Sequence, residues 1–279
     1  MKNTRSKKVL LAMTSIVLAL VIGEAATRWL LPARYRWAST PRRSEVVRYS
    51  LSVPDPEIGW VLSSESIKQH EAVPAPNGSS TRVVYSVNHG ERLTSAQPRS
   101  GPLIVVTGAS FAFGYHVTDE DSWPWLLQER LPSYHRVNVA AGAYGTDQAL
   151  QAAERKVAGS PGGASTVVLG FADSDIDRNR CSQSMLRTIY PASRPRFVQN
   201  GAGAQYKGQI KYWSLGSVAD YIIDHSFLLS RVANLVADRL VYRIEQHDGA
   251  RQLTVALIAE FADVFNHAEA GLWLWCFLT

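Results

Sequence analysis

Residues 103–114 read LIVVTGASFAFG, and this stretch decides the fold class of the chain. Its first four residues are all apolar, without the alternation of a half-exposed strand, which is typical of a parallel strand covered on both faces. The apolar run ends at Thr107-Gly108, and Ser110 follows in the next turn. The sequence therefore predicts a buried strand that leads through a turn into a helix.

Apolar runs alternate with helical patterns along the rest of the chain. Strands that alternate with helices at such intervals form right-handed βαβ units. We therefore expect a three-layer α/β/α sandwich with a parallel central sheet in residues 101–279. The further strands are expected at 136–140, 166–171 and 253–258, and the helices at 123–131, 147–157 and 218–244.

Two other segments are rich in residues that interrupt regular structure. Residues 51–100 form a β-rich preamble, in which the alternation of 81–87 predicts an edge strand or hairpin arm that ends at a turn, Asn88-His89-Gly90. We expect this preamble to be a small appendage outside the core. Residues 177–212 are broken by proline and glycine and predict a surface insertion or lid.

The N-terminus combines cations with an apolar run. Four Lys or Arg within the first eight residues precede an apolar stretch that, continued through Glu24 and Arg28, ends at Leu31. A stretch of about 23 residues is long enough to cross a bilayer. We therefore expect residues 1–31 to be an uncleaved signal anchor and transmembrane helix, followed by a linker at 32–50. The cations place the soluble domain outside the cytoplasm, and secretion after signal cleavage is the alternative.

Charge is distributed unevenly along the chain. The net charge is +5, yet residues 1–43 hold nine Lys or Arg and one acid, and the remainder holds 20 basic and 23 acidic residues. A nucleic-acid-binding domain needs its cations on the folded part of the protein. The composition therefore excludes nucleic acid as the expected partner and favours a membrane-flanking segment.

Patterns typical of metal and cofactor sites are missing. Cys181 and Cys276 are the two cysteines, and neither belongs to a CxxC pair. The acids at 173, 175 and 177 lack the spacing of a calcium loop. Gly201-Ala202-Gly203 follows no expected strand, so it predicts a flexible loop rather than a dinucleotide site. We expect no cofactor and no metal.

Small or polar residues follow each of the first three expected strands. Ser110 follows the first, Gly142 the second and Ser174 the third. Because the carboxyl ends of parallel strands meet at one edge, where open α/β sheets bind ligands, we expect these residues to lie together. Serine in such a turn exposes a hydroxyl that can act as a nucleophile, although a capping serine is the structural alternative.

Five short segments carry a family resemblance. They are Pro54-Asp55-Pro56-Glu57-Ile58-Gly59-Trp60, Asn88-His89-Gly90-Glu91-Arg92, Gly108-Ala109-Ser110-Phe111, Asp121-Ser122-Trp123-Pro124 and Tyr144-Gly145-Thr146-Asp147-Gln148. In these segments and their order the chain resembles the SGNH/GDSL hydrolase superfamily, in particular its membrane-anchored bacterial branch. The resemblance covers about residues 55–258 and implies the flavodoxin-like fold of that superfamily.

The resemblance also implies roles for individual residues. Ser110 is the implied nucleophile, and Ser110, Gly142 and Ser174 form the implied oxyanion hole. The family places an Asp-x-x-His block near its C-terminus, where His takes the serine proton and Asp orients it. Asp263 and His267 are the nearest candidates for this pair.

The chain departs from the family pattern at three places. Ala109 replaces the aspartate of the first block, and Ser174 stands where the family has an asparagine. Asp263 and His267 have one residue too many between them, so a structural or surface role for His267 is the alternative. The apolar residues 272–278 then suggest a shortened or altered C-terminal part.

The expected function is a serine esterase, deacetylase or O-acyltransferase of the cell envelope that acts on an ester or an acylated glycan. The alternative, from a different class, is a catalytically inactive protein of the same fold that binds glycan or a partner in polysaccharide assembly. The two functions share a fold and differ in whether Ser110 is supported by a complete catalytic set.

Overall fold

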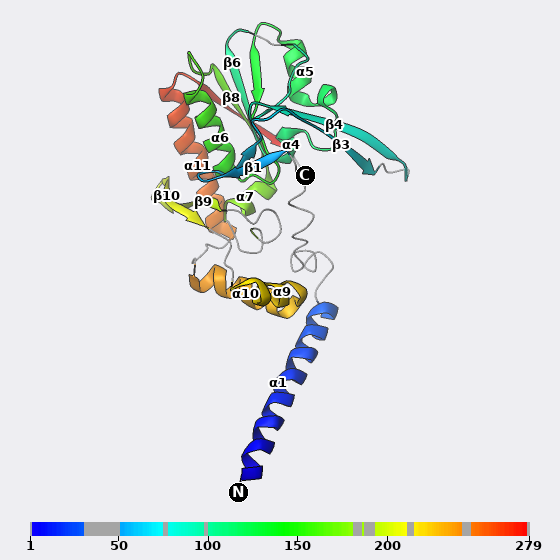
Figure 1. Cartoon of the computed structure of the whole chain (residues 1–279). Helices are drawn as coiled ribbons and strands as arrows, with labels where there is room; N and C mark the ends of the chain where they lie inside the picture. The colour runs from blue at the N-terminus through cyan, green and yellow to red at the C-terminus, as the bar shows by residue number, and fades with distance from the viewer. Residues whose placement is uncertain are drawn as a thin grey trace. The chain divides into compact units, whose positions relative to one another are not determined.

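The computed structural model describes residues 2–30, 51–74, 78–97, 100–180, 186, 193–210, 215–241 and 247–277. These residues belong to two units. One unit holds the N-terminal helix and the helices of residues 217–241, and the other holds the α/β structure (Figure 1). The expected linker at 32–50 lies outside the described residues.

The α/β unit is built on one mixed sheet. Within the described residues this sheet has seven strands in the order β11-β8-β6-β7-β5-β4-β3. The first four run parallel to one another, and β5, β4 and β3 continue the sheet with antiparallel pairing. The bounds are β3 Ile67–Pro74, β4 Ser80–Asn88, β5 Glu91–Arg92, β6 Leu103–Gly108, β7 His135–Asn138, β8 Thr166–Ala172 and β11 Gly271–Phe277.

Strand β6 lies inside the parallel part of the sheet. All six of its residues are buried, which explains why its sequence shows no alternation. It pairs with β7 on one side, where Val106 lies opposite Asn138, and with β8 on the other, where Gly108 lies opposite Gly170. The strands expected from the runs at 103, 136 and 166 are confirmed, although β7 ends at Asn138 rather than at residue 140.

The helices of this unit connect the parallel strands. The predictions at 123–131 and 147–157 are confirmed as α5 and α6. Helix α6 packs on β6 and β8, with the Thr107 hydroxyl donating to the Ala149 carbonyl at 2.5 Å, and α11 lies beside α6 (Figure 1). The bounds are α4 Ser110–Phe113, η1 Asp119–Asp121, α5 Trp123–Arg130, α6 Thr146–Ala158, α7 Asp173–Asn179 and α11 His247–His267.

The strand expected at 253–258 is wrong, because these residues lie inside α11. Leu253, Leu257, Phe261 and Phe265 are all buried, and their spacing of four residues is that of one helix face. A six-residue apolar run cannot separate a buried strand from a buried helix segment by period alone. The buried positions that continue the four-residue spacing beyond the run, Phe261 and Phe265, identify the helix.

The next parallel strand is β11, which pairs with β8 from Gly271 opposite Thr166 to Phe277 opposite Ala172. The apolar residues from 272 onward therefore form a sheet strand. Apolar and polar residues do not alternate along β11, but the pairing of its seven residues with seven consecutive residues of β8 fixes its register.

The expectation that residues 51–100 lie outside the core is also wrong in part. Strand β5 joins the preamble to the parallel strands through the pairing of Arg92 with Asn138. Val83, Tyr85 and Val87 of β4 are buried at every second position, as expected for a strand with one face in the core. The hairpin that ends at Asn88-His89-Gly90 is confirmed by the β4–β5 pair.

Two smaller hairpins complete the α/β unit. Strands β1 Ser52–Asp55 and β2 Gly59–Leu62 pair with each other, and the Gln148 side chain of α6 donates to the Ile58 carbonyl between them at 2.7 Å. Strands β9 Arg194–Asn200 and β10 Gly203–Ile210 form the second hairpin, which contacts α11. The region expected to be an insertion thus contains a hairpin, and the turn after Asn200 takes the place of the expected flexible loop.

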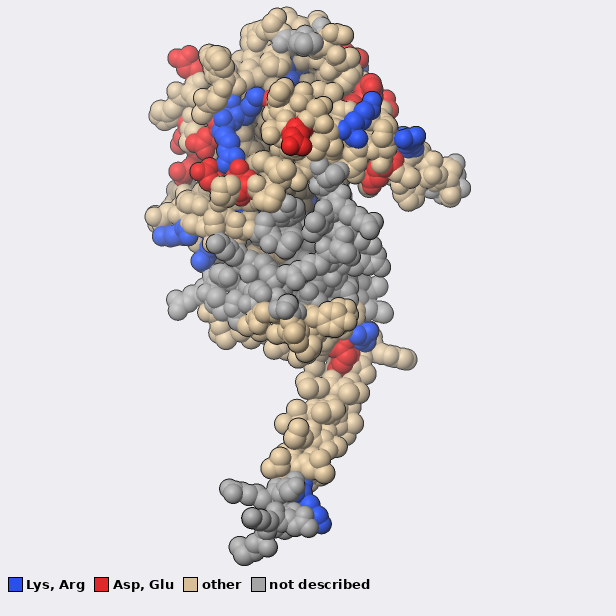
Figure 2. Space-filling view, in the orientation of Figure 1, with Lys and Arg blue, Asp and Glu red and all other residues tan. Residues whose placement is uncertain are grey.

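The other unit is helical. Helix α1, Lys2–Leu30, includes a stretch of 24 residues, Lys7–Leu30, that is long and apolar enough to cross a membrane by length and composition (mean hydropathy 2.2, none of it buried). Figure 2 shows the middle of α1 without Lys, Arg, Asp or Glu. The helix expected at 218–244 is instead α9 Ser217–His225, α10 Phe227–Val236 and a π-helical turn, η2 Ala237–Val241.

Candidate active site

The turn after β6 depends on glycine at position 108. Gly108 has a φ of +138°, which disfavours any residue with a side chain. A Cβ there would also collide with the Gly170 carbonyl of β8 and lie 2.7 Å from the Ala112 Cβ. Ala109 is buried and extended, and Ser110 begins α4 with its side chain partly exposed. The geometry therefore presents Ser110 just beyond the carboxyl end of β6.

Backbone hydrogen bonds close the turn behind Ser110. Its carbonyl accepts from the N–H of Gly114 at 2.9 Å and from the N–H of Tyr115 at 3.0 Å. The Asn138 side chain, at the end of β7, donates to the Ala112 carbonyl at 3.1 Å. Short helix α4 is thus held both within its own loop and by the neighbouring strand.

Arg92, a fully buried residue of the preamble, secures the same loop. Its guanidinium donates to the carbonyls of Phe113, Gly114 and Val117, the last two at 2.6 and 2.9 Å, and pairs with Asp119 at 3.1 Å. Burial lowers the pKa of Arg92, and the Asp119 carboxylate opposes that shift. Arg92 belongs to one of the segments that carry the family resemblance, but nothing in a single sequence indicates that an arginine next to a turn is buried.

The loop after β7 lies beside the Ser110 loop. The Ala141 N–H donates to the Gly108 carbonyl at 3.2 Å. A Cβ on Gly142 would lie 3.2 Å from the Tyr115 ring, so glycine permits this close approach. The Trp60 indole of β2 donates to the Gly142 carbonyl at 3.1 Å. Gly142 is therefore fixed by groups from β2 and from the loop of Ser110.

The loop after β8 completes the edge. Because Gly170 lies opposite Gly108, helix α7 begins at the same carboxyl edge as α4. Ser174 is exposed in the first turn of α7. The topology thus brings the loops of Ser110, Gly142 and Ser174 to one edge of the sheet, as the sequence predicts.

Buried charges lie at the same edge beneath the exposed residues. Asp147 at the start of α6 contacts Arg194 of β9 at 3.3 Å, and both side chains are almost fully buried. Burial raises the pKa of Asp147, and Arg194 opposes that shift. A Cβ at Gly145 would lie within 2.7 Å of both Asp147 and Arg194, so a larger residue does not fit there.

Two of the three acids of α7, Asp175 and Asp177, are engaged in local ion pairs. Asp175 accepts from the Ala172 N–H at 2.9 Å and from Arg178 at 2.6 Å, and Asp177 contacts Arg180 at 3.5 Å. Burial raises the pKa of Asp175 to about 6, with Arg178 acting against it. Among the residues that the structure describes, no group of three His, Cys, Asp or Glu is placed to hold a metal ion.

The structure does not bring Asp263 and His267 to Ser110. His267 ends α11, whose chain continues through Ala268 into the first residue of β11, and that residue pairs with the first residue of β8. This is the amino edge of the parallel strands, about 20 Å of strand away from Ser110. The His267 ring contacts the backbone carbonyl of Asp263, at 2.6 Å, rather than its carboxylate.

The prediction of this pair as catalytic base and orienting acid is therefore corrected. It assumed a strand at 253–258, which would have delivered residues 263–267 to the carboxyl edge. The helix that occupies those positions runs in the opposite direction and delivers them to the amino edge.

His116 is the histidine closest to Ser110 along the chain. It has a φ of +65°, is exposed, and its N–H donates to the Tyr85 hydroxyl at 3.0 Å. Its ring centre lies 6.4 Å from that of Tyr115, whose N–H is bonded to the Ser110 carbonyl. No local pattern distinguishes His116, since its spacing from Ser110 indicates only a position on the loop surface.

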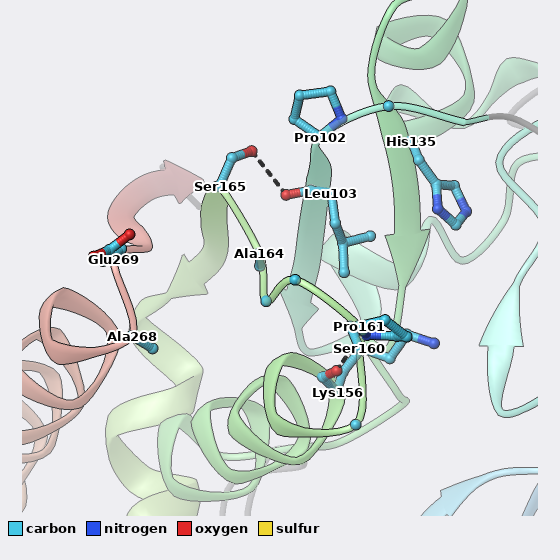
Figure 3. Close-up of a pocket in the computed structure, with 14 residues that line it drawn as sticks. Pro102, Leu103, His135, Lys156, Ser160, Pro161, Ala164, Ser165, Ala268 and Glu269 are labelled. Carbon is cyan, nitrogen blue, oxygen red and sulfur yellow. Dashed lines mark hydrogen bonds between the residues drawn. The ribbon is translucent and has the colours of Figure 1, made fainter.

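A cavity of about 590 Å³ also lies at the amino edge of the sheet (Figure 3). Leu103, His135, Lys156 and Glu269 are among its lining residues, and Ser165 donates to the Leu103 carbonyl at its wall at 2.9 Å. None of the Ser110, Gly142 or Ser174 loops contributes to it. The cavity is therefore separate from the candidate active site.

Comparisons with known proteins give a limited result. No family model matches the chain, and no curated protein matches it. Solved structures that resemble it include AlinE4, described as an SGNH-hydrolase family esterase, and two single-residue variants of esterase AlinE4. They are 11–12% identical, with a TM-score of 0.29, over 63% of this chain and 77% of theirs.

Proposed function

We propose that the chain is a serine-dependent esterase or O-acyl-transfer enzyme of the SGNH/GDSL kind. The observation that carries the proposal is the placement of Ser110 in a glycine-dependent turn beyond β6, beside the Gly142 loop and the start of α7. Three segments far apart in sequence supply the residue types that ester chemistry needs at one sheet edge.

The proposed reaction has two acyl-transfer steps. The Ser110 hydroxyl attacks the ester carbonyl, its proton passes to a base, and the alcohol leaves with a proton while the acyl group stays on Ser110. Water or a second hydroxyl then attacks the acyl-serine and regenerates Ser110. The backbone N–H groups of Ser110 and Gly142 are the proposed donors to the oxyanion, and Ser174 is the third.

The proposed fold assignment follows the same resemblance. In this assignment the described residues of 101–180, 193–210 and 247–277 form the three-layer, flavodoxin-like α/β/α sandwich and residues 51–100 precede it, while residues 217–241, which the sequence places in the same domain, belong to the helical unit. The structure supports this with the parallel strands β6, β7, β8 and β11. The preamble supports the site directly, because Arg92 and Trp60 hold the loops of Ser110 and Gly142.

The proposed location is the cell envelope. Cations before Val9 and the apolar stretch Lys7–Leu30 support a single-pass anchor with the α/β unit outside the cytoplasm. An acylated glycan is the substrate class that fits an esterase held at that surface. We expect neither a cofactor nor nucleic acid to take part, and secretion after cleavage remains the alternative location.

An inactive binding protein is the second candidate function. It is favoured by Ser174, which is shorter than an asparagine, and by the placement of His267 at the opposite edge of the sheet. Such a protein would use the same three loops to bind glycan without acylating Ser110.

Hydrolysis of p-nitrophenyl acetate separates the two functions. The proposal predicts release of nitrophenol by the wild type and loss of that activity in Ser110→Ala. Ser160→Ala is the matched control, since Ser160 bonds the Lys156 carbonyl at the amino edge. His267→Ala should also retain activity, whereas His116→Gln should lower it if His116 is the base. Equal rates for the wild type and Ser110→Ala would exclude the enzyme.

A further inference from the structure

Helix α9 exposes its apolar face. Val218, Tyr221 and Ile222 lie on one side of the helix and are 73%, 64% and 53% exposed, whereas Ile223 is buried. Positions i, i+3 and i+4 form one face of a helix. A surface helix of a soluble domain normally turns such a face towards the core.

Helix α10 shows a clear reversal of the usual pattern. Val232 and Leu235 are 49% and 59% exposed, whereas Ser230 and Asn234 are buried. Leu240, in the π-helical turn that follows, is 74% exposed. Apolar side chains are thus exposed on both α9 and α10, and α10 also buries two polar side chains.

The start of α10 is bound to α1. The Glu24 carboxylate accepts hydrogen bonds from the Ser226 hydroxyl at 2.8 Å and from the N–H groups of Phe227 and Leu228 at 3.0 Å each. These N–H groups belong to the first turn of a helix and have no partner within it. A charged residue in an otherwise apolar helix is thereby used to cap α10.

Arg28 and Gly23 extend this junction. Arg28 bonds Glu24 at 2.7 Å, donates to the His225 carbonyl at 3.4 Å, and lies 4.7 Å from the centre of the Phe227 ring. A Cβ at Gly23 would lie 2.9 Å from the Leu228 side chain, so the two helices approach closely. The end of α9 and the start of α10 are therefore attached at residues 23–28.

The attachment point fixes the depth of α9 and α10 in a membrane. From Lys7 to Glu24 the helix rises about 26 Å, close to the roughly 30 Å of a hydrocarbon core. Glu24 and Arg28 therefore lie near the boundary between hydrocarbon and headgroups. Trp29, 89% exposed, is of the residue type that prefers this boundary.

We propose that α9 and α10 form an interfacial helix pair that inserts its apolar face into the membrane leaflet entered by the C-terminal end of α1. This inference rests on the proposed anchor. The occupant is lipid because the two helices are attached to α1 at residues 23–28, at the C-terminal end of the stretch that suits hydrocarbon. Arg239 and Arg231 on exposed positions can extend to phosphate headgroups, as arginine commonly does at an interface.

Depth-dependent fluorescence quenching tests the proposal in the full chain. Single cysteines replace Ile222, Leu235, Val17 of α1 and, as control, the exposed Arg130 of α5, in a background in which both native cysteines are serine. Each protein carries an environment-sensitive dye and is reconstituted into vesicles of phosphatidylcholine and phosphatidylglycerol. The lipids bear a nitroxide quencher either near the headgroup or near the acyl-chain end.

The proposal predicts about twofold quenching at 222 and 235 by the shallow quencher, because interfacial helices sit within about 10 Å of the headgroup boundary. Val17 should respond to the deep quencher, and Arg130 to neither. Quenching at 17 without quenching at 222 and 235 would overturn the inference. This result is also the one expected if a second copy or another part of the chain, rather than lipid, covers the apolar face. Quenching at 222 and 235 without quenching at 17 would also overturn the inference, because it would contradict the spanning anchor on which the inference rests.

Discussion

Replacing Arg92 with methionine removes the guanidinium that joins the preamble to the Ser110 loop. Arg92 is 1% exposed and pairs with Asp119, which is 4% exposed. The substitution keeps most of the buried volume but leaves the Asp119 carboxylate and three loop carbonyls without this donor. Breaking a buried pair by removing one partner costs about 3–5 kcal/mol, because the remaining charge is buried and unpaired.

The matched control is Arg155→Met. Arg155 also pairs with an aspartate, Asp55 at 2.6 Å, but its side chain is 44% exposed. Exposed ion pairs contribute about 0–1 kcal/mol. Both substitutions remove an arginine that pairs with an aspartate. Arg155 also pairs with Glu57 at 2.8 Å, whereas Arg92 also donates to three loop carbonyls, so the difference between the two losses measures the contribution of the buried guanidinium together with its hydrogen bonds.

Urea unfolding of the full chain in detergent, followed by tryptophan fluorescence, measures both free energies of unfolding. We expect Arg92→Met to lose at least about 2 kcal/mol more than Arg155→Met. The double variant Arg92→Met/Asp119→Leu should recover part of this loss, because no buried charge remains. Equal losses for the two single variants would refute the reasoning, as would a double variant that is less stable than Arg92→Met.

Three further predictions concern the site and the anchor. Ser174→Asn should raise kcat/KM about tenfold in a Ser110-dependent esterase assay by supplying a longer oxyanion donor; an unchanged value would contradict this role. Since burial raises the pKa of Asp175 from 3.8 to about 6, its stabilising contribution is complete below pH 3.8 and is lost as pH rises through 6. Asp175→Asn should remove up to about 3 kcal/mol of that pH dependence in urea titrations; identical profiles would contradict it. Glu24→Ala should destabilise the start of α10 by about 1 kcal/mol, seen as faster amide exchange at Phe227 and Leu228; unchanged exchange would contradict the cap.

The central part of the fold was accessible from local sequence patterns. Residues 103–108 form a strand buried on both faces, and residues 166–172 form a strand whose residues are all buried or half-buried, so apolar runs identify both strands. The turn at Gly108 and the position of Ser110 could be predicted because the apolar run of the strand ends at Thr107-Gly108. These features depend on local composition and on the general geometry of parallel sheets, and neither requires knowledge of distant contacts.

The rest depends on contacts between segments far apart in sequence. The apolar run at residues 253–258 is compatible with a buried strand and with a buried helix segment. Only the burial of residues 250, 261 and 265 shows that the run belongs to helix α11. That error moved the predicted base to the wrong edge of the sheet. The role of Arg92 likewise depends on Asp119, 27 residues away, and on a pairing of β5 with β7 that no local pattern indicates.

Reaction with a fluorophosphonate probe tests the central claim most directly. An activated Ser110 hydroxyl attacks the phosphorus, fluoride leaves, and the adduct is located by mass spectrometry of the intact chain and of its peptides. The account predicts one adduct on Ser110 in the wild type and none in Ser110→Ala, with labelling retained in Ser160→Ala. A wild-type chain that never reacts, or one that reacts equally after Ser110→Ala, would contradict the assignment of Ser110 as the nucleophile.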